Sequence, residues 1–152
     1  MARGFKVVDD KFRKYPDKEI IIPEPATKES AGLDIRTPVQ LIIPPFSRVV
    51  VATDLKAFMN SGEFLSIHIR SSVGIKKGLI LTNVTGIIDM DYFENEDNDG
   101  NIHLALTNTT AETVVIEENE RVAQGIFQPF LRIGGQTTSK KRRGGIGSSG
   151  KE

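Results

Sequence analysis

The chain has 152 residues, and its 20 acidic and 20 basic side chains cancel, so the molecule as a whole has no field that would gather nucleic acid or an anionic membrane. It has no cysteine and two histidines, which excludes disulfides, thiolate nucleophiles and cysteine-based zinc sites and argues against a multi-histidine metal site. A single domain of this length buries about 70% of the surface that its unfolded chain exposes. The chain contains neither a run of about 20 apolar residues, as a membrane span needs, nor the apolar core of a secretory signal. We therefore expect a cytoplasmic protein that binds neither nucleic acid nor membrane.

Alternating apolar and polar residues dominate over helical periodicity. Between positions 64 and 69, Leu65, Ile67 and Ile69 fall on one face of an extended segment, which is the mark of a half-buried strand. Further apolar or β-branched runs predict four more strands, at Leu79–Leu81, Ile102–Leu106, Thr113–Ile116 and Val122–Phe130. Turn clusters separate the runs at Pro44–Pro45, Asn60–Gly62, Asn98–Gly100 and Glu117–Glu120. Many short strands joined by turns indicate an all-β barrel or sandwich.

One short helix is expected between Ser72 and Gly78, with a serine as the N-cap candidate and the glycine at its end. A helix that begins here aims unpaired backbone N–H groups and its positive dipole end at an anion, and phosphate is the natural candidate. Arg70 adds a planar fork of donors that suits phosphate oxygens. Taken alone, an Arg-Ser-Ser triplet is more often a surface turn.

Two polar segments interrupt the strand pattern. Residues 95–100 resemble part of a calcium loop, but the terminal glutamate of that pattern is absent, so we interpret them as a solvated hairpin loop. Residues 134–152 are rich in glycine, serine and basic side chains, a composition typical of a disordered tail or a basic patch. Within them, residues 144–150 also have the ingredients of a loop that wraps phosphate, because glycine lets backbone amides approach an anion closely.

Five separated segments resemble, in order, the five motifs of the trimeric deoxyuridine triphosphatases, or dUTPases. They are residues 31–35 (Ala-Gly-Leu-Asp-Ile), 70–72 (Arg-Ser-Ser), Asn83 with 86–92 (Gly-Ile-Ile-Asp-Met-Asp-Tyr), 120–124 (Glu-Arg-Val-Ala-Gln) and 143–150 (Arg-Gly-Gly-Ile-Gly-Ser-Ser-Gly). Their order and spacing argue against coincidence. Extended loops such as residues 94–100 occur in some phage and prophage members of the family. By this analogy the chain also resembles a phage-derived member, and such a protein would work in the cytoplasm of the host cell.

The resemblance implies a homotrimer of distorted, jelly-roll-like β-barrels with one short helix. Residues 1–133 would form the barrel, and residues 134–152 a flexible arm that closes over an active site. In the family each site is built by three chains: the first, second and fourth motifs come from one subunit, the third from its neighbour and the fifth from the last. A segment that a nucleotide orders would act as a lid.

The resemblance also assigns chemistry, the hydrolysis of dUTP to dUMP and pyrophosphate. Asp89 matches the carboxylate that activates a water for attack on the α-phosphorus, a general-base role worth about 10² to 10⁴ in rate. Tyr92 matches the ring that leaves no room for a ribose 2′-hydroxyl. Asn83 matches a uracil-binding side chain, and the chain around it completes the base site at Gly86, Ile87, Ile88 and His103.

Phosphate and metal binding follow from the same resemblance. The triphosphate binders would be Arg70, Ser71, Ser72, Gln124, Arg143, Gly147 and Ser148. Mg²⁺ is implied, held mainly by triphosphate oxygens and waters, with Asp34 contacting it through water, as suits an ion that retains its waters. Arg121 is assigned to structural pairing.

The chain departs from the family pattern at two places. Ile146 stands where an aromatic ring usually covers the uracil, and an isoleucine packs there without stacking as a ring does. The loop after Tyr92 is longer than usual because Phe93 to Asp99 precede Gly100. Two hypotheses for Phe93 stay open: it supplies the missing aromatic cover, or it packs in the trimer interface.

Three alternative functions are weighed. A deoxycytidine triphosphate deaminase shares the fold and an Arg-Ser-Ser segment but uses a glutamate base, and the pattern from Asn83 to Tyr92 favours the triphosphatase. A regulatory protein of this fold could signal through the loop at residues 94–100, which is the candidate contact for a protein partner. In a purely structural interpretation, all five motifs would be turns and caps.

Overall fold

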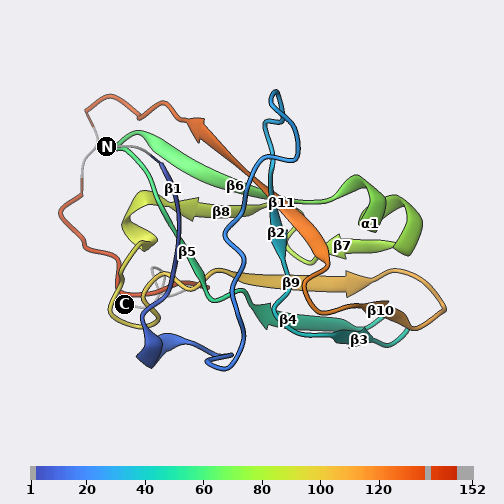
Figure 1. Ribbon diagram of the computed structural model, residues 1–152. Coiled ribbons are helices and arrows are strands. Elements are labelled where there is room, and N and C mark those ends of the chain that lie inside the picture. The colour runs from blue at the N-terminus through green and yellow to red at the C-terminus, as the bar shows by residue number, and fades with distance from the viewer. Residues whose placement is uncertain (1–2, 136–137, 147–152) are drawn as a thin grey trace.

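The computed structural model describes residues 3–135 and 138–146 (Figure 1). Strands dominate the described chain. In order, the elements are β1 Gly4–Val7, η1 Asp10–Phe12, β2 Leu33–Arg36, β3 Leu41–Ile43, β4 Arg48–Ala52, β5 Leu55–Phe58, β6 Glu63–Ile69, α1 Ser71–Lys77, β7 Leu79–Leu81, β8 Gly86–Asp89, η2 Met90–Tyr92, β9 His103–Asn108, β10 Val114–Ile116 and β11 Arg121–Pro129. The elements η1 and η2 are single 3-10 turns. The expected all-β, jelly-roll-like fold with one short helix is confirmed.

Within the described residues, all strand pairs are antiparallel and form four sheets. The largest has the order β2-β11-β6-β8, and a second has the order β4-β9-β7, while β1 pairs with β5 and β10 with β3. Figure 1 shows β6 and β8 lying over β9 and β4. The facing side chains of these layers, among them Leu65, Ile67, Leu104 and Leu106, are almost fully buried and belong to one core cluster. This burial supplies most of the driving force for folding.

The five strands and the helix expected from local patterns lie within two residues of β6, β7, β9, β10, β11 and α1, whereas β1 to β5 and β8 were not predicted. Leu65 and Ile67 point into the core as the alternation requires. The helix, however, begins one residue earlier than expected: Arg70 is its N-cap, and its carbonyl accepts bonds from the N–H groups of Val73 and Gly74. The expectation of a serine N-cap is wrong, since no side chain caps the helix. Gly78 ends it in the left-handed region, with φ of 68°, as a glycine C-cap should.

The loop between η2 and β9 differs from the solvated hairpin expected from sequence. Asn95 and Asp99 are 6% and 4% exposed, and both are hydrogen-bonded. Glu94 and Asp99 have positive φ, and so does Gly100 at 85°, which lets the chain coil back on itself. The loop is therefore a small folded unit whose polar side chains turn inward. No helix in the described ranges is long and apolar enough to cross a membrane.

Candidate active site

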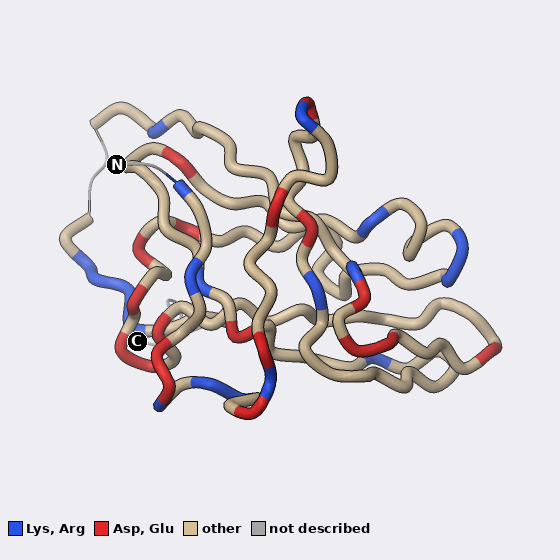
Figure 2. Tube along the Cα trace, viewed as in Figure 1, with Lys and Arg blue, Asp and Glu red and all other residues tan. Residues whose placement is uncertain are grey.

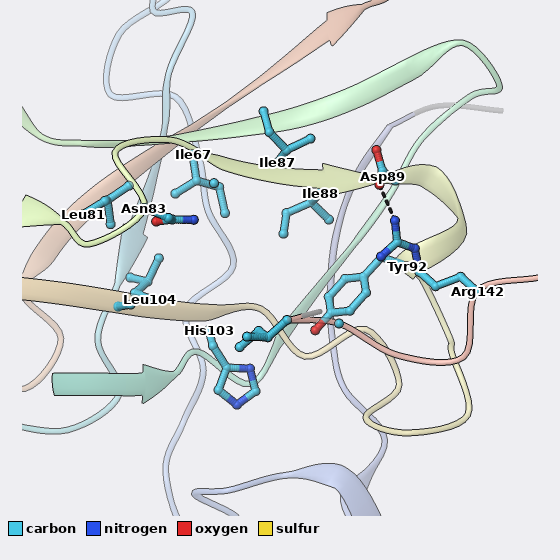
Figure 3. A pocket seen from close by; sticks show the side chains of 14 residues that line it. Ile67, Leu81, Asn83, Ile87, Ile88, Asp89, Tyr92, His103, Leu104 and Arg142 are labelled. Carbon is cyan, nitrogen blue, oxygen red and sulfur yellow. Dashed lines mark hydrogen bonds and ion pairs between the residues drawn. The ribbon is translucent and has the colours of Figure 1, made fainter. Parts of the chain in front are cut away.

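A cavity of about 270 Å³ opens between β8, β9 and the segment before the C-terminus (Figure 3). Apolar side chains from β6, β7 and β9 form its floor, and polar groups stand around it. Its lining comprises Ile67, Leu81, Asn83, Gly86, Ile87, Ile88, Asp89, Tyr92, His103, Leu104, Ala105, Arg142, Gly145 and Ile146. A small concave site with few convergent polar groups suits a nucleobase and sugar.

Asp89 ends β8 at one side of the cavity, and Asn83 lies toward the other (Figure 3). The register of β8 against β6, with Phe64 opposite Asp89, places the carboxylate at the open end of the sheet. Its side chain is 48% exposed and forms an ion pair with Arg142. The Nε of Arg142 also donates to Asp91 Oδ1 at 2.7 Å. One guanidinium thus bridges two carboxylates, and Figure 2 shows the basic stretch before the C-terminus running beside acidic residues.

Tyr92 forms the wall next to Asp89. Only 8% of it is exposed, and this burial raises the pKa of its phenol. Its hydroxyl donates to the Asn101 carbonyl at 2.8 Å and accepts from Asn98 Nδ2 at 2.7 Å. Gly145 lies against the ring so closely that a Cβ there would come within 2.8 Å of Tyr92 Cε2. The ring is therefore held by polar contacts at its tip and by backbone at its edge.

His103 begins β9, across the cavity from β8, and its Nδ1 pairs with the Asn101 carbonyl at 2.9 Å (Figure 3). The same carbonyl oxygen accepts from the Tyr92 hydroxyl, so the side chains of His103 and Tyr92 share one backbone partner. Asn83 sits in the turn between β7 and β8 and is exposed. Together with the edge of β8 it offers amide donors and acceptors, the groups that can read a nucleobase edge.

A second group of the predicted residues gathers elsewhere, around Asp34 on β2. The Asp34 carboxylate pairs with Arg70 Nε at 2.9 Å and with Arg121 Nη1 at 3.1 Å. Gln124 lies opposite Asp34 in the strand register, and a Cβ at Gly32 would come within 2.2 Å of its Oε1. Ser71 and Ser72, in the first turn of α1, are exposed beside Arg70. These groups together make a positively charged, donor-rich surface.

One chain does not bring the two groups together. Arg70 directly follows β6 and Asp89 lies opposite Phe64 at its other end, six residues away, which corresponds to about 20 Å along a strand. In Figure 1, α1 and the η2 end of β8 accordingly lie on opposite sides of the molecule. Arg70 thus does not line the cavity that Tyr92 lines in the same chain.

The predicted residues of the fifth segment have mixed outcomes. Ile146 lines the cavity, although it is 90% exposed. The side chain of Arg143 is exposed, and its carbonyl accepts from the Asp97 N–H at 3.2 Å. Gly147 and Ser148 lie outside the described residues. The described part of this segment packs on the chain's own Tyr92.

Sequence reasoning missed Arg142, which reaches the cavity where Arg143 was expected. The basic run at residues 140–143 was the available signal, but composition does not say which of four cations faces inward. Phe93 packs on Phe58 with ring centroids 6.1 Å apart and is not among the cavity-lining residues. The geometry thus gives no support to Phe93 as a cover for the base within its own chain.

Metal ligands are sparse in the described part of the chain, where no group of three or more His, Cys, Asp or Glu residues could hold an ion. Asp34 is paired with Arg70, one of the predicted phosphate binders, and with Arg121. A carboxylate has about four lone-pair sites, so capacity remains for a water. The residues fit an ion that reaches the protein through water and takes most of its ligands from a substrate.

Comparison with known proteins gives one consistent family. The dUTPase family model matches residues 18–150. A deoxyuridine 5′-triphosphate nucleotidohydrolase of Lactococcus lactis is 45% identical over 150 residues, 97% of each chain. One from Aquifex aeolicus is 36% identical over 126 residues, 81% of this chain and 80% of that protein.

Solved structures agree. The dUTPase from Streptococcus mutans superposes with a TM-score of 0.77 at 39% identity and covers 87% of this chain and 99% of that one. The dUTPase from phage phi11 of S. aureus, at 20% identity and a TM-score of 0.69 over 92% of this chain and 97% of that one, shares the fold.

Proposed function

The chain belongs to the dUTPase family, and from this premise we propose that it cleaves dUTP to dUMP and pyrophosphate with Asp89 as the general base. The water transfers a proton to Asp89 while its oxygen bonds to the α-phosphorus, and the bond from that phosphorus to the pyrophosphate oxygen breaks. The observation that carries the proposal is the exposed carboxylate of Asp89 beside the clamped ring of Tyr92, at the mouth of a cavity with Asn83 at its far end. The proposed general base, the ring that would pack on the sugar and the amide that would bind the nucleobase thus share one site.

The carboxylate of Asp89 is paired with Arg142. Phosphate oxygens bind guanidinium groups strongly, so a triphosphate in the site competes for Arg142 and frees Asp89 to accept a proton from water. The rate gain from such a base is about 10² to 10⁴, and the rest must come from positioning and charge neutralisation.

Selectivity is assigned to two groups in the cavity. The ring of Tyr92 would pack on the deoxyribose and leave no space for a 2′-hydroxyl, and its burial fits a fixed wall. Asn83 and the backbone from Gly86 to Ile88 would hydrogen-bond uracil. A base with the wrong pattern of donors and acceptors would leave buried polar groups unpaired, which discriminates strongly.

We propose a homotrimer because the phosphate-binding group lies about 20 Å from Asp89 along β6 of the same chain. Arg70, with Ser71, Ser72 and Gln124, would serve the cavity of a neighbouring subunit. Residues 134–152 would act as the arm of a site, and the subunit whose site the arm covers stays a prediction. So do the cytoplasmic location and a protein partner at residues 94–100.

Mg²⁺ is proposed to bind with the triphosphate, reached by Asp34 through water. When bound, it would neutralise phosphate charge and help the pyrophosphate to leave. The protein's part is to hold Asp34 between Arg70 and Arg121, at 2.9 Å and 3.1 Å, so that its carboxylate has a fixed direction.

Pyrophosphate release from dUTP, dTTP, dCTP and UTP tests the proposal in wild type, Asp89→Asn and the control Asp17→Asn, which makes the same charge change at an exposed turn. We expect release from dUTP alone, lowered about 10² to 10⁴-fold by Asp89→Asn and unaffected by the control. Ammonia release from dCTP without dUTP cleavage would instead identify a deaminase. A chain that leaves both nucleotides intact would contradict an enzymatic function.

A further inference from the structure

The long loop after Tyr92 is built around asparagine amides whose orientations the backbone dictates. Asn98 Oδ1 accepts from the Gly100 N–H at 3.1 Å and from Asn95 Nδ2 at 2.8 Å. A backbone N–H can only donate, so the carbonyl end of the Asn98 amide must face Gly100. Its NH₂ group must then face the other way, toward the hydroxyl of Tyr92, 2.7 Å away.

This contact completes the hydrogen bonding of the Tyr92 hydroxyl. The hydroxyl donates to the Asn101 carbonyl at 2.8 Å and accepts from Asn98. Asn95 Nδ2 donates to the Tyr92 carbonyl at 2.8 Å, so the same loop also fixes the backbone of the residue. With the tip and backbone held, the ring has little freedom to tilt toward or away from the cavity.

The loop is in turn anchored to the body of the protein. Asp99 Oδ2 accepts from Lys56 Nζ at 2.7 Å and from the Asp9 N–H at 2.7 Å. Lys56 lies on β5 with only 4% of its side chain exposed, and its ammonium also lies 5.2 Å from the ring centroid of Phe93. Asn98 is adjacent in sequence to Asp99, which is bonded to β5. This anchor keeps the amide of Asn98 close to Tyr92.

We propose that Asn98 is a positioning residue that sets discrimination between deoxyribose and ribose by holding the ring of Tyr92 at a fixed depth in the cavity. The inference rests on the proposed function, since it takes Tyr92 as the sugar wall. The Tyr92 ring excludes the 2′-hydroxyl of a ribose only if the ring cannot move back by the width of that oxygen. The hydrogen bond from Asn98 restrains this movement. The loop that lengthens this hairpin thereby acts in substrate selection.

The test is the ratio of kcat/KM for dUTP to kcat/KM for UTP. Loss of one hydrogen bond to the ring should lower this ratio about fivefold to tenfold in Asn98→Ala, chiefly through better use of UTP. Asn98→Asp keeps an acceptor for the Gly100 N–H but has no donor for Tyr92, so it should lower the ratio similarly with less disturbance of the loop. If the Asn98→Ala variant does not fold, the Asn98→Asp variant alone tests the proposal.

A double-mutant cycle separates this role from simple stabilisation. Tyr92→Phe removes the hydroxyl, so in that background Asn98→Ala should change the ratio no further. Asn108→Ala is the matched control, because Asn108 is a fully buried asparagine on β9 whose amide donates to backbone carbonyls and accepts from Thr110, none of which lines the cavity. It should lower the melting temperature and leave the ratio unchanged.

Titration of the tyrosines by NMR in the substrate-free protein gives a readout without activity. The bond from Asn98 lowers the pKa of Tyr92 against the upward effect of burial, so Asn98→Ala should raise that pKa further. An unchanged ratio in both Asn98 variants, or additive effects of Tyr92→Phe and Asn98→Ala, would overturn the proposal. A wild type that leaves dUTP intact would overturn the proposed function and the selectivity role together, while the titration would still report the contact.

Discussion

The guanidinium of Arg142 forms an ion pair with the carboxylate of Asp89, which lies 53 residues earlier in the chain. The same guanidinium donates to Asp91 at 2.7 Å, so one cation from the segment after β11 covers two acidic groups at the end of β8. The carboxylate of the proposed base is therefore paired with a cation of its own chain. A triphosphate carries more negative charge than either carboxylate, so it is well suited to displace Asp89 and Asp91 from the guanidinium of Arg142.

Arg142→Ala should lower kcat/KM for dUTP about tenfold to a hundredfold, the usual value of a hydrogen bond between charged groups. Steady-state kinetics of Arg142→Ala beside Arg143→Ala checks this, and the loss should be smaller for Arg143, whose side chain points to solvent. A larger loss in Arg143→Ala would contradict the geometry and favour the assignment made from the motif.

Mixing two inactive variants tests the trimer. If Asp89 and Arg70 of one site come from different subunits, then Asp89→Asn and Arg70→Ala chains exchanged in equal amounts should regain about a quarter of the wild-type sites, half times half. Pyrophosphate release after subunit exchange is the measurement. A double variant with both substitutions, mixed with Asp89→Asn, should recover nothing. Absence of recovery in the first mixture would mean that one chain supplies both groups.

Gly145→Ala should weaken dUTP binding, because the new Cβ would lie 2.8 Å from a ring that Asn98 and Asn101 hold in place. Overpacking of this kind costs about 1–3 kcal/mol. Gly144→Ala is the matched comparison: its Cβ would come within 2.0 Å of Asp97 Oδ2 and 2.9 Å of Asp97 Cγ, atoms of an exposed side chain that can rotate aside. The Michaelis constants should differ accordingly, and equal values would show that the ring gives way.

Lys56→Met should destabilise the fold by about 3–5 kcal/mol, because it leaves the carboxylate of Asp99, whose side chain is only 5% exposed, without its cation and with the Asp9 N–H as its remaining donor. Denaturant unfolding gives the free energy. Lys18→Met breaks an exposed pair with Glu118, so it should cost about 0–1 kcal/mol. Similar losses in the two variants would mean that the loop carries no buried charge pair.

Acid stability should depend on Arg3 and Glu63 at the start of β6. The hydrogen bond from Arg3 lowers the pKa of Glu63 from 4.5 to about 2. Because the folded pKa lies below the unfolded one, the stabilisation is complete above pH 4.5 and is lost as the pH falls toward 2. Melting temperatures of wild type and Arg3→Met should therefore differ at pH 7 and converge near pH 2. A constant difference would contradict the linkage.

The sequence by itself determined five of the eleven described strands, the end of the helix and the family resemblance. Alternation of apolar residues places Leu65 and Ile67 inward because neighbouring side chains of a strand point to opposite faces. A glycine ends the helix at Gly78 because its backbone must enter the left-handed region. These features depend on residues close together in the chain. The proposed base, the sugar wall and the phosphate binders were likewise named from short motifs.

Only the tertiary structure decided which partners those residues meet. Arg142, not Arg143, reaches Asp89, and the polar loop after Tyr92 folds inward to hold the ring through Asn98. Strand register also puts Arg70 and Asp89 at opposite ends of β6. Each outcome depends on how segments far apart in sequence pack, and a hydrogen bond or ion pair forms only within a few tenths of an ångström of its ideal length. Composition and local spacing do not carry that information, because they fix the direction of a side chain within its element and not the distance to another element.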